Sequence, residues 1–183
     1  APLTATQKEI GSGAPFGTVD VIIHGNHDHV WRNAYESLRS YFPDTPHHEL
    51  RVLLNSPLVV CNPETILVRE GQPVSHIHMV ITGTVEMLEG GRTVNGLLSQ
   101  GAMVGEVSAV ENIPATKTYR AASFVQALRI SSNLYREFIQ RNDLGGKISA
   151  LEERRGFLRS LWLCAEGLTE MTLNRLAQAI ETA

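Results

Sequence analysis

The chain has 183 residues, a formal net charge of -3 and 19% charged residues, values typical of a soluble globular protein. It lacks the basic excess that favours binding to a phosphate backbone, so we expect no nucleic-acid partner. No apolar run approaches the roughly 20 residues of a membrane-spanning helix, and the first residues lack a basic start followed by an apolar stretch. Cys61 and Cys164 lie far apart and outside any metal-ligand spacing. We therefore expect buried thiols in a cytoplasmic protein.

The first quarter of the chain predicts a polar lead followed by two helices. Residues 1–17 have a loop-like composition, and the apolar run at 19–23 predicts a short strand. Over 27–42 apolar residues recur every three to four positions, which predicts an amphipathic helix that ends at the prolines of "FPDTP". A second short helix is expected over 47–56.

The middle of the chain has the pattern of a β-rich domain. From residue 57 to 130, short runs rich in Val, Ile and Thr are separated by Gly, Pro and Asn. The "EGG" at 89–91 predicts a hairpin turn between strands at 85–88 and 93–98, because glycine accepts the positive φ of such turns. Many short strands with regular turn signals indicate a sandwich, jelly roll or barrel.

The last quarter is helical again. A helix is expected over 131–142, a longer one over 145–164, and a last one after Thr169, which can cap it. The expected buried positions are Leu134, Phe138 and Ile139 in the first, Ile148, Leu151, Arg155 and Leu158 in the second, and Leu173, Leu176, Ala177 and Ile180 in the third.

Glycines at regular positions carry a family resemblance. Glu70-Gly71 follows the first barrel strand, "MVITG" ends at Gly83, Gly101 comes next, and Gly105-Glu106 opens the following segment. In this order and spacing, residues 47–165 resemble the cyclic nucleotide-binding domain family. The resemblance implies an α+β, mainly β fold, a double-stranded β-helix jelly-roll barrel of eight strands flanked by N- and C-terminal helices. We expect an N-terminal extension over 1–46, the barrel over 47–144 and C-terminal helices over 145–183.

The resemblance also implies a phosphate-binding cassette. In the family, the amides of a short helix receive the cyclic phosphate, a glutamate accepts the ribose 2′-hydroxyl, and an arginine nine residues later pairs with the phosphate. Glu106 stands at the glutamate position, but nine residues on lies Ala115, so the family's "P-R-x-A" has become "P-A-T-K". The candidate ligand-binding residues are Gly105, Glu106, Val107, Ser108, Ala115 and Thr116.

Arg120 could be aligned with the missing arginine only by a shift of five residues. The ungapped register places Ile130 fifteen residues after Ala115, where the family's last barrel strand carries an apolar residue. An odd slip would turn the core face of that strand to solvent, so we take Ala115 as the equivalent position. Lys117 could partly replace the arginine, since its flexible ammonium can reach toward the same site.

These residues favour a non-enzymatic regulatory or sensor module that does not bind cAMP or cGMP in the usual way, with no cofactor and no metal. Another small-molecule ligand remains an alternative, as do a genuine cAMP- or cGMP-binding domain and a purely structural interaction module. Glu106 has two interpretations, a ribose ligand or a carboxylate that stabilises the N-terminus of a helix.

The stretch "HGNHDH" at 24–29 suggests an enzyme as a further alternative. His24, His27, Asp28 and His29 are possible transition-metal ligands, as in the "GNHD" loop of metallophosphoesterases, but the other motifs of that family are absent from the preceding residues. In the simpler interpretation, Asn26 or Asp28 caps the following helix. Two further histidine pairs are interpreted as structural, with His47-His48 at a helix start and His76 and His78 on one face of an edge strand.

The C-terminal residues lack the basic recognition helix that follows the barrel in bacterial transcription factors of this family. The segment 157–180 resembles the helical opening of a second such domain, and it fits equally well a helical cap packed on the first. The helix over 147–165 is a candidate for a homodimer contact or for contact with a further domain.

Overall fold

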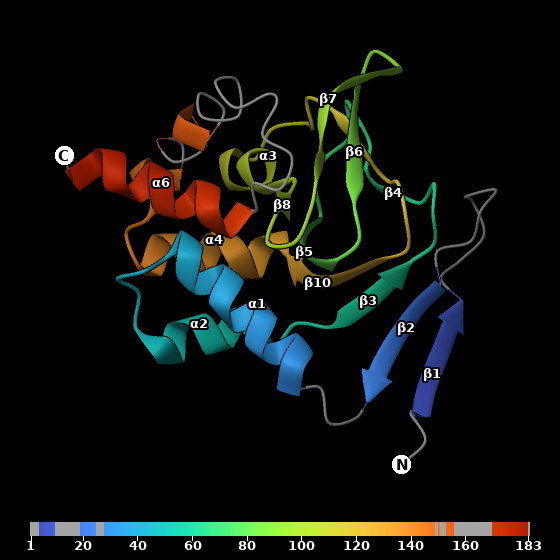
Figure 1. The fold of residues 1–183 in the computed structure, drawn as a ribbon, viewed down its shortest axis with the longest axis horizontal. Coiled ribbons are helices and arrows are strands. Elements are labelled where there is room, and N and C mark those ends of the chain that lie inside the picture. Colours follow the sequence, from blue (N-terminus) through green and yellow to red (C-terminus); the bar gives the residue numbers. More distant parts are fainter. Residues whose placement is uncertain are drawn as a thin grey trace.

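Two four-stranded antiparallel sheets form the centre of the molecule (Figure 1). The computed structural model describes residues 4–9, 19–24, 28–148, 150, 153–155 and 170–182. The strand orders are β3-β10-β5-β8 and β4-β9-β6-β7. The strands are β3 (Leu58–Cys61), β4 (Ile66–Val68), β5 (His76–Thr82), β6 (Val85–Glu89), β7 (Arg92–Leu98), β8 (Met103–Val104), β9 (Thr118–Ala121) and β10 (Val125–Ser131).

This arrangement confirms the predicted α+β fold, in which eight strands form the jelly roll and helices flank it. The two sheets do not close into one continuous barrel, since no strand pairing within the described residues joins them. Cys61 is 1% exposed, as expected for a buried cysteine, whereas Cys164 lies outside the described residues.

The turns of the sheets follow the glycine pattern. Gly90 and Gly91 join β6 to β7 with φ angles of 57° and 79°, which confirms the predicted hairpin. Gly83 has a φ of 91°, and a Cβ there would lie 2.1 Å from the carbonyl oxygen of Phe124. A side chain at this corner is therefore excluded both by the backbone angle and by the neighbouring chain.

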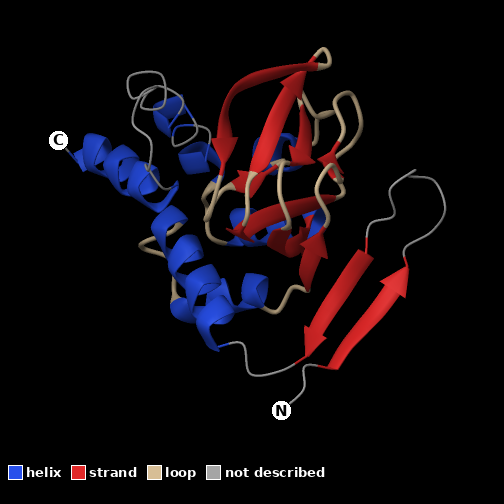
Figure 2. Ribbon diagram, turned by 45° about the vertical axis from the view of Figure 1, so that its right-hand side comes forward, coloured by secondary structure: helices blue, strands red, loops and turns tan. Residues whose placement is uncertain are grey.

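Helices cover one side of the sheets (Figures 1 and 2). The expected helices near both ends of the domain are confirmed, with α1, α2 and α4 close to their predicted limits. Aromatic rings fill the space between them, and the Phe42 and Phe138 ring centroids are 5.2 Å apart. The helices are α1 (Asp28–Tyr41), α2 (His47–Leu54), α3 (Glu106–Glu111), α4 (Ser132–Arg141) and α6 (Glu170–Thr182).

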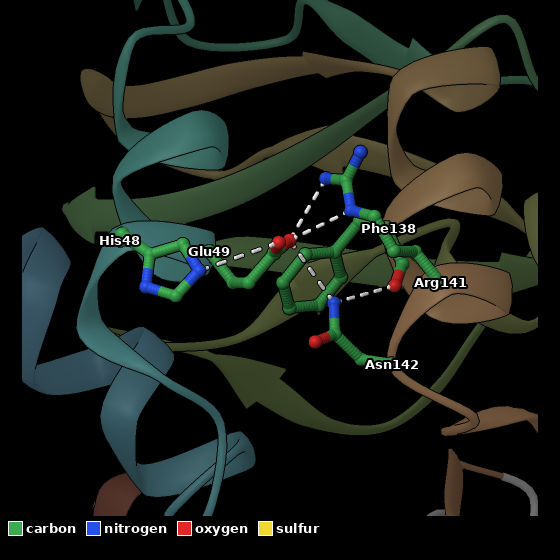
Figure 3. A network of polar contacts seen from close by, with 5 residues as sticks. All are labelled: His48, Glu49, Phe138, Arg141 and Asn142. Atoms are coloured by element: carbon green, nitrogen blue, oxygen red, sulfur yellow. Dashed lines mark hydrogen bonds and ion pairs between the residues drawn. The ribbon is translucent and has the colours of Figure 1, made fainter.

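A polar contact joins α2 to the end of α4 (Figure 3). Oε2 of Glu49 accepts a hydrogen bond from Nδ2 of Asn142 at 3.2 Å and pairs with Nη2 of Arg141 at 2.8 Å. The hydrogen bond from Asn142, followed by the bond and charge of Arg141, lowers the pKa of Glu49. The carboxylate therefore contributes to helix packing in its ionised form.

Two expectations near the chain ends are wrong. The lead was expected to be a loop, but β1 (Thr4–Glu9) pairs antiparallel with β2 (Val19–His24), because the partner strand supplies hydrogen bonds that composition alone does not reveal. In α6, Leu173 and Ala177 are buried as expected, whereas Leu176 and Ile180 are 38% and 48% exposed. The helix is rotated so that Asn174 takes an inner position, where it has polar partners.

Several expectations fall on residues that are not described. Residues 145–148, 150 and 153–155 are helical, and the remainder of the segment 145–164 and Thr169 lie outside the described residues. Ile148 is buried as expected, and so is Arg155. Described contacts place α6 against α1, through Asn174 with Ser40 and Gln178 with the carbonyl oxygen of Tyr41.

Candidate functional site

The cassette is a short helix placed directly after β8. Gly105 precedes α3 in the left-handed conformation, with φ 83° and ψ 9°. A Cβ at Gly105 would lie 3.0 Å from Cγ1 of Val74 and 3.1 Å from Cγ2 of Val68. Glycine is thus needed here for the backbone angle and for close packing, whether or not a ligand is bound.

The carboxylate of Glu106 is directed into the protein. Its side chain is buried, and Oε1 accepts a hydrogen bond of 2.5 Å from the hydroxyl of Tyr135 on α4. Nη2 of Arg155 lies 3.6 Å from Oε2. Burial first, and then the charge and hydrogen bond of Glu106, raise the pKa of Tyr135 well above its usual value. Glu106 thus engages Tyr135 and Arg155, which lie outside the cassette.

Arg155 extends this contact to two further helices. Its Nη1 donates to Oδ1 of Asn174 at 2.9 Å, and Nδ2 of Asn174 donates to Oγ of Ser40 at 3.0 Å. The guanidinium carbon lies 4.6 Å from the centroid of the Tyr41 ring. We call Glu106, Tyr135, Arg155, Asn174 and Ser40 the buried polar network. It connects the cassette to α4, α6 and α1.

Ala115 is buried, and both its backbone N–H and its carbonyl oxygen are hydrogen-bonded. Its N–H donates to the carbonyl oxygen of Gln72 at 2.9 Å, and its own carbonyl accepts from the N–H of Gly71 at 2.8 Å. The residue is 4% exposed. Ala115, which the sequence predicts to be equivalent to the family's arginine, thus presents a buried methyl group.

The other candidate residues carry no charge. Val107 and Ser108 are half-buried on α3, and Thr116 is exposed. At the far end of the cassette, Nη1 of Arg136 donates to the carbonyl oxygen of Ala109 at 2.8 Å. The guanidinium of Arg136 is thus hydrogen-bonded to a backbone carbonyl near the end of α3.

Arg120 lies on β9 and is paired across the sheet. Its Nε is 2.5 Å from Oε1 of Glu86 on β6, the residue directly opposite in the register. Ile130 is fully buried in β10, as the ungapped register requires, and Lys117 is half-buried just before β9. Arg120 thus has a carboxylate partner on the neighbouring strand.

The histidine stretches fall into different parts of the fold. His47 and His48 begin α2 as expected. The expectation of an edge strand for His76 and His78 is wrong, because β5 lies between β10 and the short strand β8. In the "HGNHDH" stretch residues 25–27 lie outside the described residues, Asp28 begins α1, and among described residues no three His, Cys, Asp or Glu side chains form a potential metal site.

Sequence reasoning missed the buried polar network. Tyr135 was not among the expected core residues, and Arg155 was named only as a position on an apolar stripe. A charged residue at a core position of a helix was the available signal, because a buried arginine requires a polar partner.

Comparisons with known proteins find similarity to the cyclic nucleotide-binding domain family. Residues 58–142 match the family model described as cyclic nucleotide-binding domain. Among curated proteins, the chain is 35% identical over 82 residues to potassium channel KAT1 of Oryza sativa subsp. japonica, covering 43% of this chain and 11% of that protein. The chain thus spans about a tenth of the length of this relative.

Solved structures share the fold at low sequence identity. A regulatory subunit of a cAMP-independent protein kinase A from Trypanosoma cruzi, bound to guanosine, aligns with a TM-score of 0.62 and 18% identity over 85% of this chain and 55% of that one. The regulatory domain of Toxoplasma gondii PKA with cAMP gives a TM-score of 0.60 and 19% identity over 85% and 60% of the two chains. Within the described residues, no helix is long and apolar enough to cross a membrane.

Proposed function

We propose that this chain contains a non-catalytic regulatory domain of the cyclic nucleotide-binding family, whose model matches residues 58–142, and that the domain does not recognise a cyclic phosphate in the usual way. The observation that carries the proposal is Ala115, a buried methyl group at the position of the phosphate-binding arginine. The similar structures are described as regulatory subunits or domains, which supports a regulatory rather than a catalytic role.

The missing cation has a large energetic consequence. Loss of a buried, charge-assisted contact to an anion costs about 2–5 kcal/mol, or roughly thirty- to several-thousand-fold in affinity. A domain that would bind cAMP at micromolar concentration with an arginine would bind it near millimolar concentration with Ala115. Arg120 does not restore the contact, because it is already paired with Glu86.

The glutamate adds a second obstacle. Glu106 is buried and directed at Tyr135, so turning its carboxylate outward to a ribose hydroxyl would break the hydrogen bond from Tyr135. A hydrogen bond to a buried charged group contributes about 1.5–3 kcal/mol, and this cost would be subtracted from ligand binding. Of the two side chains that hold a cyclic nucleotide in the family, the arginine is therefore absent and the glutamate is already hydrogen-bonded to Tyr135.

Restoring the arginine tests the proposal. Calorimetric titration with cAMP and cGMP should give at least about thirtyfold stronger binding for Ala115→Arg than for the unchanged protein. Lys117→Gln and Arg120→Gln serve as matched controls and should leave weak binding unchanged. If cyclic nucleotides bind strongly and Arg120→Gln abolishes this binding, the alignment of Ala115 with the family's arginine is wrong. If Lys117→Gln abolishes it, the lysine replaces the arginine.

Nucleosides, which lack the phosphate, test whether the cassette recognises that group. A cassette without a phosphate-binding cation does not discriminate in favour of the phosphate, so guanosine and adenosine are titrated beside the cyclic nucleotides. Guanosine is included because the similar structure from Trypanosoma cruzi contains it. The proposal is contradicted if cAMP or cGMP binds the unchanged protein at least tenfold more tightly than the corresponding nucleoside.

A further inference from the structure

A cavity of about 570 Å³ lies outside the cassette. Its walls come from β4, from the loop that leads to β5, and from residues of β5, β9 and β10. None of the candidate cassette residues lines it. Pockets that hold small molecules have volumes of about 300–1,000 Å³, so the cavity is of sufficient size for a ligand.

The lining of this cavity is rich in cationic groups. Among the described residues, the basic and imidazole side chains of the lining outnumber its acidic ones, of which there is one, Glu64. Arg69 is exposed at the rim, and Arg120 enters from β9 while paired with Glu86. The basic and imidazole side chains of the lining are Arg69, His76, His78, Arg120 and Arg129.

His78 provides an independent observation in the same cavity. The residue is 7% exposed, and its Nδ1 has no hydrogen-bond partner in the structure. His78 lies directly opposite Arg129 in the β5–β10 register, so the two side chains share one face of the sheet. The ring of His78 thus lines the cavity next to a guanidinium, and a ligand atom reaches its unpartnered Nδ1, which is itself buried, only after the ring turns.

We propose that this cavity is a binding site for a small dianion that carries a phosphate group or two carboxylates. The planar guanidinium groups of Arg69 and Arg129 match the oxygen geometry of either group. The ring of His78 supplies a further hydrogen-bonding group once it turns toward the bound anion. The proposal concerns a second site and is independent of whether the cassette binds a cyclic nucleotide.

The charges around His78 agree with this assignment. Burial first, and then the charges of Arg129 and His76, lower the pKa of His78 to about 3, so the ring is neutral near neutral pH. A bound anion would offset the two neighbouring charges and would favour a proton on Nδ1, which then donates to the anion.

Two variants of opposite expected sign test the site. Calorimetric titration of the full chain uses inorganic phosphate in one arm and succinate in the other, and saturable binding of at least one probe is expected. Arg69→Gln removes an exposed charge of the rim and should weaken that binding about tenfold. Glu86→Gln releases Arg120 from its partner and should strengthen binding several-fold, a gain that damage to the fold would not produce.

The control is Arg92→Gln, which removes an exposed arginine that does not line the cavity. It should leave binding unchanged. The arm with the stronger binding identifies the anionic group. The proposal is overturned if neither probe binds saturably up to about 10 mM, if Glu86→Gln does not strengthen binding, or if Arg92→Gln weakens it as much as Arg69→Gln.

Discussion

Removal of the Tyr135 hydroxyl should destabilise the domain by about 2 kcal/mol. The hydroxyl donates to the Glu106 carboxylate, and both side chains are almost completely buried. A hydrogen bond to a buried charged group contributes about 1.5–3 kcal/mol. Tyr135→Phe keeps the ring, whose centroid lies 6.2 Å from that of Phe138.

Urea unfolding at neutral pH measures this loss. A double-mutant cycle of Tyr135→Phe with Glu106→Gln isolates the energy of the pair, which should be at least about 1 kcal/mol. The matched control is Tyr35→Phe, where the hydroxyl contacts Arg39 and His47 in a more exposed position and a smaller loss is expected. A loss below about 0.5 kcal/mol for Tyr135→Phe, or strict additivity in the cycle, would refute the assignment of Glu106 to the buried polar network.

Three further predictions concern other parts of the fold. Burial and the charge of Arg129 lower the pKa of His78 to about 3, so its contribution to stability is present above pH 6.5 and is lost as the pH falls toward 3. The free energy of unfolding should be about 2–3 kcal/mol lower at pH 4.5 than at pH 7.5, and His78→Gln should abolish this difference. An equal difference in the variant would contradict the burial of the neutral ring. Gly83→Ala should cost well above 2 kcal/mol or prevent folding, because the Cβ would meet the Phe124 carbonyl oxygen, whereas Gly96→Ala has a similar φ with nothing within 4 Å and should cost only about 1–2 kcal/mol. If the two glycine variants lose equal stability in thermal unfolding, the clash is not the cause. The Asn142 hydrogen bond and Arg141 lower the pKa of Glu49, so its contribution is present above pH 4.5 and is lost as the pH falls further, and Glu49→Gln should reduce this acid sensitivity in the same unfolding series.

Local features of the chain were accessible from the sequence. The β6–β7 hairpin follows from two adjacent glycines, and the positions of Gly83 and Gly105 follow from backbone angles that other residues resist. Helix α1 follows from the spacing of its apolar residues. In each case, the residues that determine the structure are near neighbours in the chain.

Features that depend on distant residues were not accessible. Strand β1 is specified by pairing with β2, and its own composition resembles that of a loop. In α6 the periodicity defines a helix, but Ser40, which is 134 residues from Asn174, helps to select the buried face. The cavity beside His78 likewise requires the register of β5 against β10, which no local pattern specifies.

We propose that the cassette does not hold a cyclic phosphate. Calorimetric titration of the unchanged protein with cAMP and with cGMP, up to about 1 mM, tests it most directly. Binding should be absent or near millimolar, because Ala115 supplies no cation and Glu106 is held by Tyr135. A dissociation constant in the low micromolar range for either nucleotide would contradict this account.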